Sequence, residues 1–155
     1  MRYTYVATHS RAHEAVEAMQ TLLAAKVSLL QQLDGANVYA HEAPADKPAS
    51  GKWVVVRERI SIGGEPETAS GLVFPTVQVM SESRRALHTA ATARSFHAGV
   101  QDIIASVLLV SSLTVTTGEA KSVNQVERPS PVAYDADDDT RYSTSAFSVT
   151  MGPSA

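Results

Sequence analysis

Apolar residues recur at three- and four-residue steps over residues 13–34, near the start of the chain. This spacing places them on one face of an amphipathic helix. The residues that form this face are Val16, Met19, Leu23, Val27, Leu30 and Leu33. Ser10 or Thr8 is suited to cap the start of the helix, and Gly35 follows where a left-handed stop residue is expected. The pattern therefore predicts one long N-terminal helix.

Alternating apolar and polar positions replace the helical pattern after a short strand at 37–41 and a proline-containing loop at 43–51. Along residues 53–62, one strand face carries Val54, Val56, Ile60 and Ile62, and the other carries Trp53, Val55, Arg57 and Arg59. A second strand is predicted at 72–80. Residues 61–71 between them contain three glycines and a proline, so the pair is predicted to form a hairpin with a long tip.

Pro75 lies inside the second predicted strand. Because proline has no N–H to donate to a neighbouring strand, it is expected at an edge or a bulge. The sequence thus predicts that this strand borders the sheet, where it would be covered within the subunit or paired with a neighbouring one.

A second helix is predicted over residues 94–111, with Val100, Ile104 and Leu108 on its apolar side. The Ala-rich stretch at 85–93 either extends this helix or forms a separate short piece. Short strands are expected near 113–117, 122–127 and 132–134, and a final strand at 142–151. The chain is therefore predicted to be one α+β domain spanning residues 1–155. Its mostly antiparallel sheet would be packed against a long N-terminal helix and a second central helix.

Composition removes several classes of protein. The chain has 155 residues, enough for one domain, and no cysteine, which excludes disulfide scaffolds, thiolate metal sites and cysteine nucleophiles. A net charge of −3 argues against broad binding to a phosphate backbone. We also expect no membrane span and no secretion signal, because no apolar run has the required length.

The negative charge is concentrated near the end of the chain. Residues 111–155 carry three Lys/Arg against six Asp/Glu, and four of those carboxylates are Asp135, Asp137, Asp138 and Asp139. A calcium-binding EF-hand loop starting at Asp135 would need glycine and glutamate where Thr140 and Ala146 stand. We therefore interpret this segment as a solvated acidic turn before the last strand.

Motifs for catalysis or metal binding are incomplete. His13 begins a zincin-like helix motif, but Glu17 occupies the position of the second histidine. His9 and His13 would share a helix face and be able to bind a metal, although exposed residues at a helix start are the simpler interpretation. The sequence contains neither a serine nucleophile elbow nor a phosphate-binding loop. No catalytic, cofactor or metal site is predicted.

Taken as a whole, the chain resembles the tail terminator (tail completion, or minor tail U-like) proteins of long-tailed bacteriophages. The resemblance extends over nearly the full length and depends on element order and on local features. These are the helix ending at Asp34-Gly35, the strand starting Trp53-Val54-Val55-Val56, the strand ending Val77-Gln78-Val79, the helix around 100–110, and the acidic turn and closing strand at 137–151.

The resemblance implies a structural virion protein of the phage neck, without enzymatic activity and without a cofactor. Such proteins form a hexameric ring that caps the tail tube, ends tube polymerisation and provides a surface for head attachment. The implied partners are further copies of the chain, the tail tube protein and a head–tail connector protein, with DNA passing through unbound. The implied location is the virion, after assembly in the host cytoplasm.

Candidate subunit or lumen surfaces follow from the charged positions. They are the edge strand marked by Pro75, Arg57 and Arg59, the hairpin tip with Glu65 and Glu67, and the acidic turn with Asp135, Asp137, Asp138 and Asp139. Arg57 and Arg59 beside Trp53 fit an interface better than a nucleic-acid site. The acidic turn is expected to face the lumen or a subunit contact. The alternatives are another head–tail connector or stopper protein or, from a different class, a small-molecule-binding domain or hydrolase.

Overall fold

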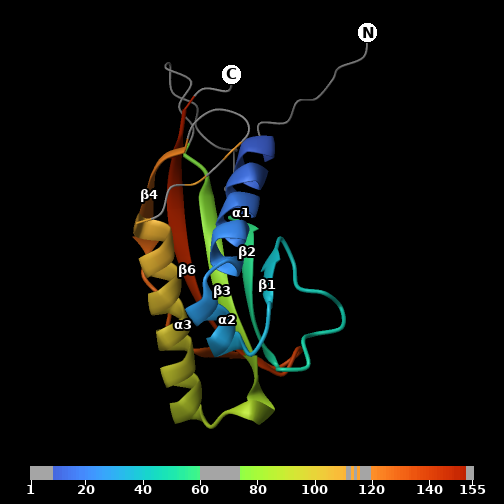
Figure 1. Cartoon of the computed structure of the whole chain (residues 1–155). Coiled ribbons are helices and arrows are strands. Elements are labelled where there is room, and N and C mark those ends of the chain that lie inside the picture. The colour runs from blue at the N-terminus through green and yellow to red at the C-terminus, as the bar shows by residue number, and fades with distance from the viewer. Residues whose placement is uncertain (1–8, 60–73, 111–112, 114, 116–119, 153–155) are drawn as a thin grey trace.

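A computed structural model of the chain describes residues 9–59, 74–110, 113, 115 and 120–152. The helices are α1 (His9–Ala24), α2 (Val27–Leu33), the short 3₁₀ helix η1 (Arg85–Leu87) and α3 (Ala90–Val110). The strands are β1 (Val38–Ala40), β2 (Lys52–Glu58), β3 (Thr76–Arg84), β4 (Ala120–Glu127), β5 (Ala133–Asp135) and β6 (Thr140–Met151). Figure 1 shows their arrangement.

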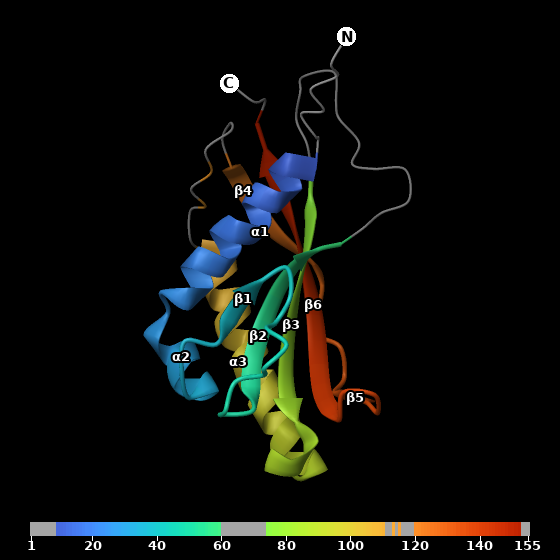
Figure 2. The ribbon, with the colours of Figure 1, turned by 90° about the vertical axis from the view of Figure 1, so that its right-hand side faces the viewer.

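The strands form one sheet in the order β1-β2-β3-β6-β4, with β5 also paired to β6. All pairings are antiparallel except that of β1 with β2. Helices α1, α2 and α3 cover one face of the sheet, as Figure 2 shows edge-on. The predicted α+β class and mostly antiparallel sheet are confirmed.

The core lies between the helices and the sheet. It is formed by apolar side chains from both layers, among them Val16, Met19, Leu23, Val54, Val56, Val77, Val79, Ile104, Leu108, Phe147 and Val149. The strand residues alternate as predicted, since Val77 and Val79 are fully buried while the residues between them are partly exposed. Hydrophobic burial on this face is the main source of stability.

The predicted single N-terminal helix is wrong in one respect, because it is broken between Ala24 and Val27. Lys26 has extended backbone angles (φ −84°, ψ 105°), and its N–H is bonded to the Leu23 carbonyl at 3.1 Å. The break turns α2 so that Leu29 and Leu33 are fully buried, whereas Val27 is 66% exposed. The predicted stop is near Gly35, but the left-handed residue is Asp34, with φ 52°.

The edge predicted at Pro75 is also wrong. Strand β3 begins at Thr76, just after the proline, and lies in the centre of the sheet between β2 and β6. Pro75 therefore deprives the strand of no N–H, and its carbonyl accepts a bond from the Val149 N–H at 3.0 Å. Among the described strands, the outer ones are β1, with three residues, and β4, with eight, so β4 is the longer open edge.

The other predicted strands and the second helix are present in the described part of the chain, except for the strand at 113–117. The short strand at 37–41, the strands near 122–127 and 132–134 and the closing strand are present as β1, β4, β5 and β6. The second helix begins at Ala90, so the stretch at 85–93 does both things that its sequence left open: residues 85–87 form the separate η1, and residues 90–93 extend α3. Of the strand predicted at 113–117, the described residues Leu113 and Val115 lie in no strand. The hairpin tip, with Glu65 and Glu67, lies outside the described residues, and within them no helix is long and apolar enough to cross a bilayer.

Candidate functional site

The acidic turn joins β5 to β6 at the lower end of the sheet in Figure 2. Asp139 adopts a left-handed conformation (φ 51°), and the Asp137 N–H donates to the Asp135 carboxylate at 3.0 Å. The Tyr134 hydroxyl donates to the Asp139 carboxylate at 2.6 Å. The turn is therefore ordered by its own side chains, while Asp137, Asp138 and Asp139 remain exposed.

Positive charge from η1 lies beside this turn. The guanidinium of Arg85 lies 5.2 Å from the Tyr134 ring centroid and 4.0 Å from the Asp139 carboxylate. The backbone N–H of Arg85 donates to the Asp139 carbonyl at 3.1 Å. Among the described residues, no ion pair includes Asp137 or Asp138. The turn thus presents two carboxylates outward, and Asp139 is engaged within the chain.

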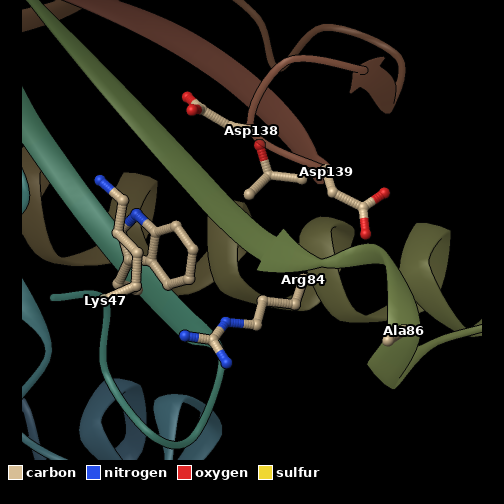
Figure 3. A pocket seen from close by; sticks show the side chains of 7 residues that line it. Lys47, Arg84, Ala86, Asp138 and Asp139 are labelled. Carbon is tan, nitrogen blue, oxygen red and sulfur yellow. The ribbon is translucent and has the colours of Figure 1, made fainter. Parts of the chain in front are cut away.

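A cavity of about 220 Å³ lies on the sheet face opposite the helices, beside the acidic turn. Figure 3 shows Lys47 and Arg84 on one side of it and Asp138 and Asp139 on the other. Trp53 forms part of the wall, and Lys47 Nζ lies 5.7 Å from its ring centroid. The volume is below the range typical of ligand sites, roughly 300 to 1,000 Å³. Two cationic and two carboxylate side chains line the cavity. This lining fits a contact with another charged surface better than the binding of a buried small molecule.

The buried Trp53 and the half-buried Glu82 lie side by side on this face. The indole N–H of Trp53 donates to the Glu82 carboxylate, and only 1% of Trp53 is exposed. Burial raises the pKa of Glu82, an effect that the bond from Trp53 and the charges of Lys47 and Arg57 oppose. Trp53 is therefore a structural anchor and not an exposed binding residue.

The loop that carries Lys47 depends on a glycine. Gly51 has φ 71°, and a Cβ at this position would lie 2.4 Å from Leu87 Cδ1. The Gly51 carbonyl accepts a bond from the Arg84 N–H at 2.8 Å, which joins the loop to the end of β3. Glycine adopts this conformation without strain, whereas a side chain here would be strained and would displace the end of the exposed Leu87 side chain.

Arg57 and Arg59 are both exposed and already paired. Arg57 Nε donates to the Gln78 side chain at 2.8 Å, and Arg59 forms an ion pair with Glu127 of β4. Ladder pairing places Arg57, Gln78, Ala146 and Glu127 in one row across the four strands. Arg57 and Glu127 share this row, and Arg59 is paired with the same glutamate, so each arginine is engaged within the chain. Their place in an interface stays a prediction.

A buried polar network lies on the helix-covered face of the sheet and was not predicted from the sequence. His97 of α3 lies between two serines of β3, with Nδ1 2.8 Å from Ser81 Oγ and Nε2 2.9 Å from Ser83 Oγ. Gln101, one turn later, donates to Ser81 Oγ at 3.3 Å and accepts from Ser145 Oγ at 2.7 Å. The local signal was the i, i+2 spacing of the serines and the i, i+4 spacing of His97 and Gln101.

This network supports packing and not catalysis. Burial lowers the pKa of His97 to about 4, and the nearby positive charges of His88 and Arg141 act in the same direction. Ser81 and Ser83 are fully buried, so neither hydroxyl can reach a substrate as a nucleophile. The hydrogen bonds instead satisfy polar groups that would otherwise be costly to bury.

A second histidine cluster joins α1 to the end of β1. The Nε2 atom of His13 lies 2.8 Å from Glu17 Oε1, and the Nε2 atom of His41 lies 3.8 Å from the same oxygen. The sequence pattern indicated His13 and Glu17, but it did not place His41 beside them, because His41 is far away along the chain. His9, the other suggested ligand, is the first residue of α1, and its side chain lies outside the described ones.

Comparison with known proteins gives one informative result. No family model matches the sequence, and no curated protein matches it. Among solved structures, a chain of "Virion of native gene transfer agent (GTA) particle" matches with a TM-score of 0.63 and 18% sequence identity. The match covers 94% of this chain and 98% of that chain. At this identity the likeness shows a common fold, and the chain is similar over almost its whole length to a component of a virion.

Proposed function

We propose that the chain is a structural protein of a phage-like virion that forms a ring at the neck and caps the tail tube. The observation that carries the proposal is the fold match to a virion chain, which leaves almost nothing of either chain unmatched. The similarity of the sequence to tail terminators supports the finer assignment. In this role the ring ends tube polymerisation and provides the surface to which the head connector attaches.

The size of the domain supports a ring. A folded chain of this length has a radius of gyration of roughly 15 Å, so one copy cannot enclose a DNA duplex. A closed ring with head-to-tail contacts needs two different surfaces on each subunit. The tail terminator resemblance implies six copies, with DNA passing through the centre without specific contacts.

The β4 edge is the first of these surfaces. Only β6 pairs with β4 among the described strands, and β4 carries Val126, which is 51% exposed. Helix α3 contacts β4 and ends with Leu109 and Val110, which are 44% and 84% exposed. An unpaired strand edge beside exposed apolar side chains fits a subunit contact.

The opposite edge of the sheet supplies a different surface. It is formed by β1, whose Val38 carbonyl accepts a bond from the Gln20 side chain at 2.9 Å. Because β1 and β4 lie at opposite edges, contacts through these two sides can continue from one subunit to the next. The acidic turn, with Asp137 and Asp138 free of ion pairs within the described residues, would face the lumen, since carboxylates do not neutralise passing phosphates.

Native mass spectrometry and negative-stain imaging of the purified protein test the ring. We expect a closed oligomer that Val126→Lys converts to smaller species, because a charge would be buried without a partner. Val27→Lys is the matched control, since Val27 is 66% exposed at the start of α2 and belongs to neither β4 nor β1. A wild-type protein that stays monomeric at high concentration and leaves tail length unchanged on deletion would refute the proposal.

A binding assay separates the tail terminator from another head–tail connector or stopper. A terminator is expected to bind the ends of purified tail tubes, whereas a connector is expected to bind the portal-side complex. Deletion of a terminator should give tails of irregular length. Tails of normal length that fail to join heads would favour the connector.

A further inference from the structure

We infer that His13, Glu17 and His41 form a binding site for a divalent transition metal ion, with Zn²⁺ as the best fit. One ligand atom from each side chain lies within 4.8 Å of the other two. No other group of three His, Cys, Asp or Glu residues in the described part of the chain comes as close together. This inference is independent of the proposed ring.

The distances suit a tetrahedral ion. With metal–ligand bonds near 2.0 Å, two ligand atoms in a tetrahedral site lie roughly 3.3 Å apart. The two measured separations from Glu17 Oε1, 2.8 Å to His13 and 3.8 Å to His41, bracket this value. Small side-chain rotations would therefore bring the three atoms onto one ion. Two imidazoles and one carboxylate are ligands that zinc commonly takes in proteins.

His41 is the residue that most needs this explanation. Its backbone lies in the left-handed region, with φ 71°, which is uncommon for a residue other than glycine. Its Nε2 atom is buried and has no hydrogen-bond partner among the residues that the structure describes. The ring stacks on that of His13 at a centroid distance of 4.2 Å and an interplanar angle of 18°. A metal ion would use the Nε2 nitrogen after one of the two rings rotates, because the lone pairs of stacked, nearly parallel rings do not point to one ion.

Both elements that carry the ligands are held in place by the fold. Helix α1 is fixed to the sheet by fully buried residues, among them Val16 and Met19, which flank Glu17. The N–H of His41 donates to the Val56 carbonyl at 2.7 Å, which fixes its backbone on β2. The backbones that carry the ligands are therefore held in place, and binding has to order only the side chains.

The site is open on one side. The side chains of His13 and Glu17 are 52% and 58% exposed, so water or a group from another molecule can take the fourth position. Three protein ligands and an accessible fourth position differ from a closed structural zinc site. The bound ion would join α1 to the loop that follows β1.

Zinc titration of the purified, metal-stripped chain tests the site. Isothermal calorimetry with ZnCl₂ is expected to give one ion per chain, and Co²⁺ should give the strong visible absorption of a four-coordinate ion. Zinc at a hundredfold excess over its Kd should raise the Tm by roughly 5 to 10 °C. A wild-type chain that binds no zinc in this titration overturns the inference.

Variants decide whether these three residues hold the ion. We expect His41→Ala and Glu17→Gln each to weaken zinc binding by more than about tenfold, because each removes one ligand. Glu42→Gln is the matched control, since Glu42 is an exposed carboxylate next to His41 and outside the cluster. All three substitutions are on the surface, so circular dichroism should show an unchanged fold. Zinc binding that all three variants retain at full strength also overturns the inference.

Discussion

Two histidine clusters in this molecule show how the surroundings decide what a histidine does. In the first, His97 is 1% exposed, and both of its ring nitrogens lie within hydrogen-bond distance of serine hydroxyls. In the second, His13 and His41 share one exposed carboxylate, and Nε2 of His41 makes no hydrogen bond to any described residue. The first cluster is complete within the chain, whereas the second has an unused ligand atom.

The difference separates stability from binding. A buried polar group must find its partners inside the fold, because leaving it unsatisfied is costly. A polar cluster at the surface has water as an alternative partner, so its members contribute little to stability and remain available to a ligand. We therefore expect changes in the His97 network to affect folding, and changes in the His13–Glu17–His41 cluster to affect metal binding.

The largest effect is expected for His97→Ala. The substitution leaves a cavity against β3 and removes the hydrogen-bond partner of Ser83 and one of the partners of Ser81, which should lower the free energy of unfolding by about 3 kcal/mol. Urea unfolding followed by circular dichroism measures this loss. The control is His88→Ala, at a partly exposed histidine near the start of α3, which should cost less than about 1 kcal/mol. Equal losses in the two variants would show that the buried His97 is no more important for stability than a partly exposed histidine.

Acid should destabilise the wild-type protein through the same residue. The pKa of His97 is about 4 in the folded chain, below its ordinary value of 6.5, so the unfolded chain takes up the proton first. The stabilisation is complete above pH 6.5 and falls by about 3 kcal/mol as the pH drops through 4. Urea midpoints measured across this range test the prediction.

Other titrating groups are separated by a variant. His88, whose pKa is also lowered by burial, acts in the same direction as His97. Glu82 acts in the opposite direction, because its raised pKa favours the folded state as the pH falls. His97→Gln should flatten the acid loss. An acid loss of the same size in this variant would assign the effect to other residues.

A smaller effect is expected for Ser83→Ala. The substitution removes the partner of His97 Nε2 but leaves the ring in place, so we expect a loss of about 1 to 2 kcal/mol in the free energy of unfolding. Ser106→Ala is the matched control, because Ser106 is an exposed serine of α3 whose hydroxyl donates only to the Ile103 carbonyl of its own helix. The control should change stability by less than about 0.5 kcal/mol. If Ser83→Ala leaves the free energy of unfolding unchanged, the hydrogen bond between Ser83 and His97 does not contribute to stability.

The smallest effect on folding is expected for His41→Gly without metal. Glycine adopts φ 71° without steric cost, which offsets the entropy it gains in the unfolded chain, so stability should change by less than about 0.5 kcal/mol. The same variant should lose the increase in Tm that zinc produces in the wild type. Thermal unfolding with and without ZnCl₂ measures both quantities. A large loss of stability without metal would place His41 with His97, as a residue that the fold requires.

Local periodicity accounts for the elements that the sequence predicted well. The amphipathic spacing of Val16, Met19 and Leu23, and the alternation in β2 and β6, depend on neighbours a few residues away. Strand order does not have this property. The residues around Pro75 fit a strand at the edge of the sheet as well as a strand in its centre. The pairing of β3 with both β2 and β6 places this strand in the centre.

Burial of polar residues was the second limit. Ser81 and Ser83 look like the exposed end of a strand in the sequence, so the predicted strand stopped at residue 80, whereas β3 continues to Arg84. They are fully buried because α3 presents His97 and Gln101 opposite them. A pattern of hydrophobicity cannot contain this information, since a polar side chain becomes a core residue only when its partners arrive from another element.

The sequence by itself determined the fold class, the two main helical segments, the alternating strands and the acidic turn ahead of the last strand. Each follows from the preferences of nearby residues and from the apolar face that each element must bury. The tertiary structure alone decided that β4 is the longer open edge, that His97 is a buried and neutral core residue, and that His41 lies against His13 and Glu17. These features depend on contacts between segments far apart in the chain, and the packing of the helices on the sheet fixes them.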